Sequence, residues 1–157
     1  MVEQMQEGGR DLEQERRCVF CELVQGKAPI SKIAETKNTL AFSALDDGYP
    51  LLITKEHIRD VFDPRLDLKT QKELGVMTTK LSRVLREVDG VDSVTIVSNN
   101  GPYAGQEIPH FHVHIMPRFP GDGRVRLSRG IRLSRAELDI KAQNYRIRMQ
   151  QSRLESH

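Results

Sequence analysis

The stretch S-N-N-G-P-Y-A-G-Q-E-I-P-H-F-H-V-H-I-M-P-R, residues 98–118, contains three histidines that alternate with apolar residues. A period of two is typical of a β-strand whose two faces have different surroundings. The pattern predicts that His110, His112 and His114 share one face of a strand and line an accessible surface or cleft, while their apolar neighbours enter a core. Pro117 is expected to end this strand or to confine it to a sheet edge.

The residues before this strand, N-N-G-P-Y-A-G-Q at 99–106, are rich in asparagine and glycine. These residue types favour turns and loops that expose backbone N–H groups. The sequence therefore predicts a polar loop that leads directly into the row of histidines.

The rest of the chain supplies further strands and two helices. Short apolar runs at 32–35, 39–45 and 51–54, separated by turn residues, predict an antiparallel meander, and residues 93–98 predict one more strand. Between 66 and 88, apolar residues recur at spacings of three and four, which indicates an amphipathic helix that packs on the sheet. A capping box, S-R-A-E at 134–137, opens a final helix. Because strands and helices do not alternate, we expect an α+β fold with about five antiparallel strands, one long helix and a C-terminal helix.

A chain of 157 residues is long enough for one domain with its own core. We expect a flexible N-terminal arm at 1–17, a folded domain at 18–120, and a basic loop with a C-terminal helix at 121–157. The acidic and polar start of the chain does not resemble a secretion signal. No apolar run approaches the roughly 18 residues that span a bilayer. We therefore expect a soluble cytoplasmic protein with no membrane partner.

The net charge of +2, from 24 basic and 22 acidic side chains, gives no argument for a nucleic acid polymer as a partner. The basic residues are unevenly distributed, however, because a run of arginines follows the histidines. This run is interpreted as a solvated loop, with a rim that attracts phosphate as the alternative. The run consists of Arg118, Arg124, Arg126, Arg129, Arg132 and Arg135.

The two cysteines, Cys18 and Cys21, are separated by two residues. In a cytosolic chain this spacing indicates metal or redox chemistry before a structural disulfide. With His57 and one histidine of the strand they would complete a tetrahedral zinc site. A redox pair and buried, unreactive thiols are the alternatives. A second metal hypothesis makes all three histidines of the strand ligands of a catalytic ion.

In combination, these motifs closely resemble the histidine-triad (HIT) nucleotide hydrolases and transferases. The resemblance covers roughly residues 18–120 and rests on H-F-H-V-H-I-M-P-R at 110–118, C-V-F-C at 18–21, T-L-A-F at 39–42 and G-Y-P-L-L-I-T-K-E-H at 48–57. It implies a HIT fold, a homodimer whose two sheets join, and a small-molecule nucleotide substrate that is cleaved at its α-phosphate.

The resemblance also implies the roles of individual residues. His112 becomes the nucleophile that forms a covalent nucleotidyl intermediate, and His114 donates a hydrogen bond to a phosphate oxygen. The amides of Asn99 and Gln106 bind ribose or phosphate, and Gly105 lets the backbone approach the ligand closely. These residues form the predicted catalytic and substrate-binding set, together with Glu107.

By the same resemblance, four residues bind a structural zinc ion: Cys18, Cys21, His57 and His110. The ion would brace the first strands against the histidine strand, so His110 would take no part in catalysis.

Three positions depart from the usual HIT pattern. Tyr49 stands where a histidine is common, Thr54 replaces a proline, and Glu107 stands where some members have a serine. A carboxylate at Glu107 either transfers a proton or plays a simple surface role. Tyr49 is expected to alter the preference for the leaving group. Two other functions compete with the enzyme: a nucleotide-binding protein with little turnover, and a metal-dependent hydrolase.

Overall fold

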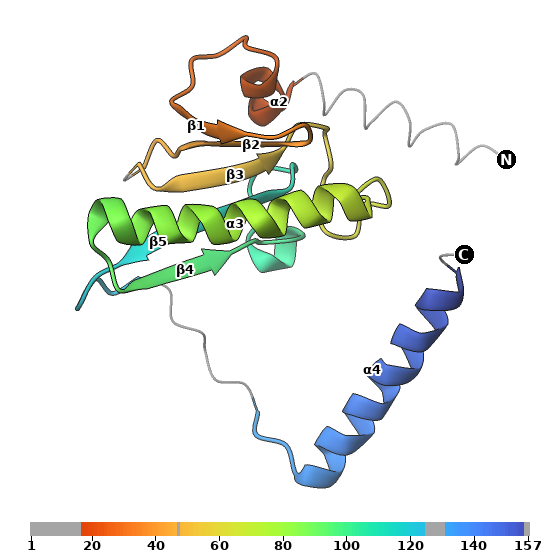
Figure 1. The fold of residues 1–157 in the computed structure, drawn as a ribbon. Coiled ribbons are helices and arrows are strands. Elements are labelled where there is room, and N and C mark those ends of the chain that lie inside the picture. The colour runs from red at the N-terminus through yellow and green to blue at the C-terminus, as the bar shows by residue number, and fades with distance from the viewer. Residues whose placement is uncertain (1–16, 47, 125–130, 156–157) are drawn as a thin grey trace, which may run out of the picture. The chain divides into compact units, whose positions relative to one another are not determined.

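Five strands form one antiparallel sheet in the order β1-β2-β3-β5-β4 (Figure 1). This computed structural model describes residues 17–46, 48–124 and 131–155. The strands are β1 (Lys32–Glu35), β2 (Thr39–Ser43), β3 (Pro50–Thr54), β4 (Ser93–Val97) and β5 (His112–Arg118). The predicted α+β fold with about five antiparallel strands is thus confirmed.

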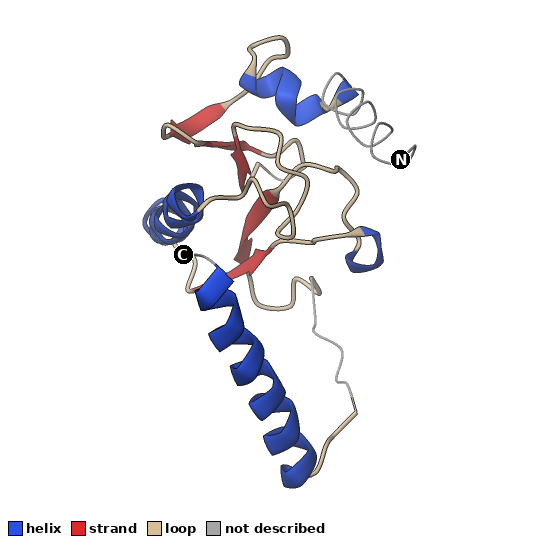
Figure 2. Ribbon diagram, turned by 90° about the vertical axis from the view of Figure 1, so that its right-hand side faces the viewer, coloured by secondary structure: helices blue, strands red, loops and turns tan. Residues whose placement is uncertain are grey.

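The long predicted helix is α3 (Leu68–Asp89), and it covers one face of the sheet (Figures 1 and 2). It begins after Asp67, whose carboxylate accepts a hydrogen bond from the Thr70 N–H at 2.7 Å. It ends at Gly90, whose φ of 64° is left-handed and favours glycine. Short helices are α2 (Val19–Val24) and the 3-10 helix η1 (Pro102–Ala104).

Alternation along the strands separates two apolar cores, one on each face of the sheet. The core under α3 contains Ala41, Leu52, Val113 and Ile115 together with Leu74, Met77, Leu81 and Leu85 of the helix. The opposite core contains Leu40, Phe42, Leu51 and Ile53 together with Phe20 and both cysteines. His112 pairs with Ile53, and His114 with Leu51, in the antiparallel register. These two imidazoles therefore lie on the α2 side of the sheet.

The histidine strand starts later than its sequence pattern predicts. β5 begins at His112, and His110 lies in a bend just before it. The ring of His110 is completely buried, so the prediction that all three histidines belong to the strand and line an accessible surface is wrong for this one. The reason is that its backbone N–H bonds to the Ile108 carbonyl at 2.8 Å instead of to a neighbouring strand.

Pro117 does not end β5, which continues to Arg118. The strand is central only as far as His114, where its pairing with β3 stops. From there on only β4 runs alongside, so the proline lies on a local sheet edge, the position that a strand proline usually takes.

The contacts divide the chain into residues 1–122 and 123–157. The second unit contains α4 (Arg135–Glu155), which opens with the predicted capping box. The Glu137 carboxylate accepts from the Ser134 N–H at 2.7 Å, and the Ser134 hydroxyl accepts from the Glu137 N–H at 3.3 Å. Residues 1–16 of the predicted N-terminal arm lie outside the described residues. Among the described residues, no helix combines the length and the apolar character needed to cross a membrane.

Candidate active site and metal cluster

A pocket of about 840 Å³ opens on the α2 side of the sheet. His112 and His114 line it, together with Tyr49, the residue just before β3. Much of the remaining lining is apolar and comes from α2, the loop after it, and strands β2 and β3: Val19, Phe20, Leu23, Ile30, Phe42 and Leu51. The pocket therefore offers an apolar wall to a flat organic group and two imidazoles to a polar one.

The ring of His112 is held in one orientation by a backbone carbonyl two residues earlier. Its Nδ1 lies 2.6 Å from the His110 carbonyl oxygen, and that oxygen accepts a hydrogen bond. The Nδ1 must therefore carry the ring proton, which leaves the lone pair on Nε2. The ring of Phe20 meets His112 edge-on, with the centroids 5.3 Å apart. The side chain is thus a buried imidazole with a fixed orientation, and its Nε2 is the nitrogen left for a ligand.

His114 is half-buried beside His112, with the two ring centroids 5.0 Å apart. Burial lowers the pKa of His114 below its ordinary value, and the neighbouring His112 lowers it further. At neutral pH the ring is therefore uncharged. Its Nδ1 lies 3.2 Å from the Tyr49 hydroxyl.

Of the predicted loop residues, Asn99, Gly105 and Glu107 line the pocket. Gly105 has a φ of 79°, a conformation in which a side chain is strained. Gln106 lies outside the residues that form the lining, and its amide bonds within the protein instead. The amide oxygen accepts from the Gly101 N–H at 2.8 Å, and its nitrogen donates to the carbonyls of Arg59 and Ile108 at 2.7 and 3.1 Å. Gln106 therefore fixes the shape of the loop.

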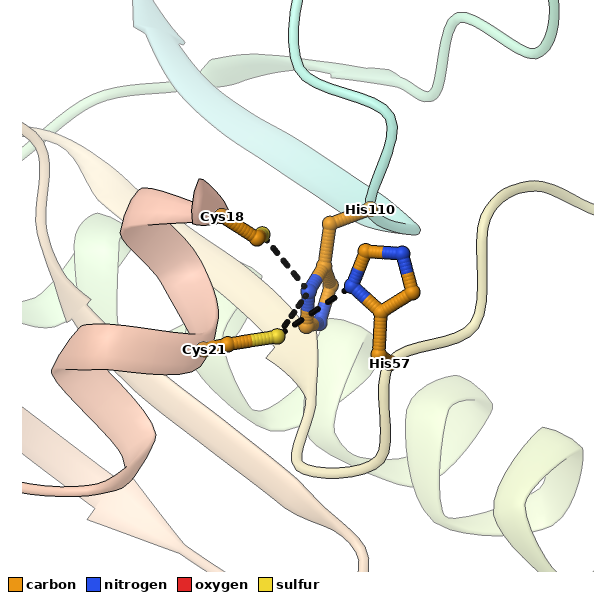
Figure 3. Close-up of side chains that lie close together, drawn as sticks. All are labelled: Cys18, Cys21, His57 and His110. Carbon is orange, nitrogen blue, oxygen red and sulfur yellow. Dashed lines mark hydrogen bonds between the residues drawn. The ribbon is translucent and has the colours of Figure 1, made fainter. Parts of the chain in front are cut away.

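The structure brings the four predicted metal ligands together in one buried cluster (Figure 3). Cys18 and Cys21 belong to the α2 region, His57 to the loop after β3, and His110 to the bend before β5. All four ligand atoms lie within 4.8 Å of one another. The Cys18 Sγ is 3.4 Å from the His110 Nδ1, and the Cys21 Sγ is 3.2 and 3.6 Å from the Nδ1 atoms of His57 and His110.

These separations suit a tetrahedral zinc ion. Zinc binds nitrogen at about 2.0 Å and sulfur at about 2.3 Å, so neighbouring ligand atoms lie roughly 3.3 to 3.8 Å apart. Two thiolates and two imidazoles are also a common structural zinc set. The residues present therefore fit the predicted structural zinc.

The backbone carbonyl of Thr54 orients one ligand of this cluster. Its carbonyl oxygen lies 2.7 Å from the His110 Nε2, which donates to it and so turns Nδ1 toward the cysteines. Burial lowers the pKa of His110 to about 4, which keeps the ring in the neutral form that binds metals. The sequence marked Thr54 only as a departure from proline and gave no sign of this role.

The hypothesis that one catalytic ion binds all three histidines of the strand is wrong. His110 turns toward the cysteines, whereas the Nδ1 of His112 bonds to a carbonyl. In the described part of the chain, the Cys18, Cys21, His57 and His110 cluster is the one group of three or more histidine, cysteine or acidic side chains close enough to hold a metal.

Arg118, the first of the basic run, braces the fold. Its guanidinium donates to both carboxylate oxygens of Asp122, at 2.8 and 2.6 Å, and to the Thr95 hydroxyl at 2.8 Å. Arg124, Arg132 and Arg135 are exposed, as the interpretation of a solvated segment expects, and Arg126 and Arg129 lie outside the described residues.

Comparison with known proteins identifies the family. The model of the HIT domain matches residues 25–121. The chain belongs to the HIT family. Among its HIT relatives is an uncharacterized HIT-like protein of Methanocaldococcus jannaschii, 37% identical over 116 residues, or 69% of this chain and 84% of the relative.

Two further members bear on function. Adenosine 5'-monophosphoramidase hnt1 of Schizosaccharomyces pombe is 31% identical over 104 residues, which cover 64% of this chain and 74% of that protein. The crystal structure of a zinc-bound histidine triad protein from Mycobacterium smegmatis superposes with a TM-score of 0.61 at 32% identity, and the match covers 76% of this chain and 86% of that one.

Proposed function

We propose that this HIT protein is a nucleotide hydrolase or nucleotidyl transferase that cleaves an adenylylated or related conjugate at its α-phosphate. The observation that carries the proposal is the orientation of His112, whose Nδ1–H bonds to the His110 carbonyl while the ring lines the pocket. A ring fixed in this way presents a lone pair to a bound ligand. The phosphoramidase activity named for the S. pombe relative supports the same class of reaction.

In the first half-reaction, the Nε2 lone pair of His112 forms a bond to the α-phosphorus. The bond from phosphorus to the leaving group breaks, and the leaving group departs with the electron pair. The Nδ1 proton stays on the ring and keeps its hydrogen bond to the His110 carbonyl oxygen, 2.6 Å from Nδ1. This hydrogen bond stabilises the positive charge that develops on the imidazole ring. His114 and the amide of Asn99, both in the pocket lining, donate to the phosphate oxygens.

In the second half-reaction, water attacks the same phosphorus from the side that the leaving group vacated. The bond between phosphorus and Nε2 breaks, the electron pair returns to the ring, and the proton of the water passes to solvent. A different acceptor in place of water makes the reaction a transfer. Glu107, in the pocket lining, is proposed as a substrate-binding residue near this acceptor.

Zinc is proposed as a structural cofactor, held by Cys18, Cys21, His57 and His110. The zinc-bound M. smegmatis relative supports this assignment. When bound, the ion crosslinks α2, the loop after β3 and the bend before β5. Because His110 also supplies the carbonyl that orients His112, the cluster positions the nucleophile through the backbone and leaves the chemistry to the imidazole.

The decisive experiment replaces the nucleophile. His112→Asn removes the reactive Nε2 but keeps an Nδ2–H donor for the His110 carbonyl, so the fold should survive. Turnover of adenylyl conjugates with amine, sulfate, nucleotide or sugar phosphate leaving groups should fall by orders of magnitude, while nucleotide affinity persists. Intact mass of a His114-substituted variant after incubation should reveal a nucleotidyl adduct. Equal turnover in His112→Asn and the unchanged protein would overturn the proposal.

A second function, nucleotide binding with little turnover, is favoured by one observation. Tyr49 lies in the pocket beside His114, at the position where the HIT pattern commonly has a histidine. In that case His112→Asn would leave the slow turnover unchanged, and tight nucleotide binding would be the activity that matters.

We also propose that the protein forms a homodimer through its sheet and acts in the cytoplasm. β4 is an edge strand, and its Ile96 is 51% exposed, so the edge offers both backbone groups and apolar surface to a second copy. Reducing conditions in the cytoplasm would keep both thiols reduced and available for zinc. Sedimentation equilibrium of the full chain tests the dimer.

A further inference from the structure

Tyr49 and His114 form a side-chain pair inside the pocket. Leu51 of β3 lies opposite His114 in the register, so Tyr49, two residues earlier, is a diagonal neighbour on the same face. The Tyr49 hydroxyl lies 3.2 Å from the His114 Nδ1, and the ring centroids are 5.9 Å apart at an interplanar angle of 54°. Both side chains line the pocket.

The direction of this hydrogen bond follows from the surroundings. A phenol at neutral pH carries a proton and donates readily, and a neutral imidazole has one nitrogen that accepts. If the phenol donates to Nδ1, the His114 proton lies on Nε2. If the phenol accepts instead, His114 and His112 both present lone pairs to the pocket. Two lone pairs that face the oxygens of an anionic phosphate repel it, so donation by Tyr49 is the arrangement compatible with a phosphate ligand.

We infer that Tyr49 is a positioning residue that holds His114 as a neutral imidazole with its N–H on Nε2, aimed at a phosphate oxygen of the substrate. This inference rests on the proposed function for the identity of the ligand. His112 is held in the opposite tautomer by the His110 carbonyl. Two adjacent histidines thereby acquire different tasks, because one supplies a lone pair and the other supplies a donor.

The same contact selects the substrate class. A neutral imidazole that has its proton on Nε2 can donate a hydrogen bond, but it gives up that proton only by becoming an anion or by taking the proton of Tyr49, which would leave a phenolate, and neither is favourable at neutral pH. His114 therefore stabilises charge on the phosphate without protonating the leaving group. Leaving groups that are stable as anions, such as sulfate or phosphate, should depart readily. An amine, which needs a proton, should depart slowly.

A spectroscopic test of the tautomer is independent of activity. Protein labelled with 15N-histidine gives long-range 1H–15N correlations that distinguish the two neutral tautomers at pH 8, and His114→Asn assigns the signals. His114 should carry its proton on Nε2, and Tyr49→Phe should convert it to a mixture. Tyr103→Phe, which alters a fully exposed tyrosine, is the matched control and should leave the pattern unchanged. An Nδ1–H tautomer, or an unchanged His114 pattern in Tyr49→Phe, would overturn the inference.

The kinetic test compares adenosine 5'-phosphosulfate with adenosine 5'-phosphoramidate. Tyr49→Phe should lower kcat for the phosphosulfate by roughly three- to tenfold, the effect of one net hydrogen bond, with a smaller change in KM. Tyr49→His supplies an imidazole that can hold a proton, so it should raise the phosphoramidate rate relative to the phosphosulfate rate by about tenfold or more. An unchanged ratio refutes the selection of leaving groups. If His112→Asn has the turnover of the unchanged protein, the proposed function fails instead, and the NMR result still decides the tautomer.

Discussion

Removing the metal should destabilise this protein far more than it slows the chemistry. The four ligands come from three segments that are distant in the sequence, and all four are buried. A ligand that binds only the folded state adds about 4 kcal/mol of stability when its free concentration is a thousand times its Kd. For a chain of 157 residues, each kcal/mol corresponds to about 2 to 4 °C in Tm. Chelation should therefore lower Tm by about 8 to 16 °C.

The assay is thermal unfolding with and without a chelator, followed by re-addition of zinc. Cys21→Ser supplies the matched control because it loses a thiolate that contacts both ligand histidines. This variant should unfold near the Tm of the chelated protein and should not respond to the chelator. Zinc should restore the Tm of the unchanged protein only.

Turnover of the chelated protein is measured at 25 °C, where it should still be folded. His112 does not belong to the metal cluster. It is connected to the cluster by the hydrogen bond from its Nδ1 to the carbonyl of His110. Since one hydrogen bond contributes about 0.5 to 1.5 kcal/mol, turnover should fall by at most about tenfold. A chelated protein with an unchanged Tm would show that no metal braces the fold. A chelated protein that is folded but inactive would make the metal catalytic and refute the assignment of His112.

Three further predictions concern the loop, the core and pH. Gln106→Ala removes three hydrogen bonds of the loop that carries Gly105, so urea unfolding should show a loss of about 1 to 3 kcal/mol and KM should rise. Ile115→Val, at a fully buried position under α3, should cost about 0.5 to 1.5 kcal/mol in the same measurement and leave kcat/KM unchanged. The pKa of His114 is lower in the folded protein than in the unfolded chain, so the unfolded chain binds the proton more readily. The protein therefore has its full stability above the unfolded pKa of about 6.5 and loses part of it as the pH falls toward the folded pKa. His114→Asn should therefore flatten part of the decline in stability between pH 7 and 5, and an equally steep decline would contradict this assignment.

Regular patterns in the sequence were sufficient to predict most of the fold. The recurrence of apolar residues at spacings of three and four predicted α3, from Leu74, Met77, Leu81, Val84, Leu85 and Val88. Four of these six side chains are buried, whereas Val84 and Val88 are exposed. The turn residues between short apolar runs predicted the meander of β1 to β3. Such patterns are local, and burial of one face is enough to enforce them.

Contacts between distant residues could not be read from the sequence in the same way. Alternation alone placed His110 with the other two histidines, because period two cannot show where strand pairing begins. The hydrogen bond from the Gln106 amide to the carbonyl of Arg59, 47 residues earlier in the chain, is a second contact that the sequence pattern does not show. The contact between Tyr49 and His114 depends on the register of β3 against β5, which only the folded sheet reveals.

The arrangement of the site explains how neighbouring histidines take on different chemistry. His110 and His112 are two residues apart, and the backbone carbonyl between them orients the second ring while the side chain of the first turns toward the thiols. Because β5 begins between these residues, the first ring falls in a bend that is buried against α2 and the second on a strand that faces the pocket. A one-residue slip in the register of β5 against β3 would turn His112 toward the core under α3 and bring Val113 to the pocket. The division into a metal ligand, a nucleophile and a donor therefore depends on strand register as much as on the identity of the side chains.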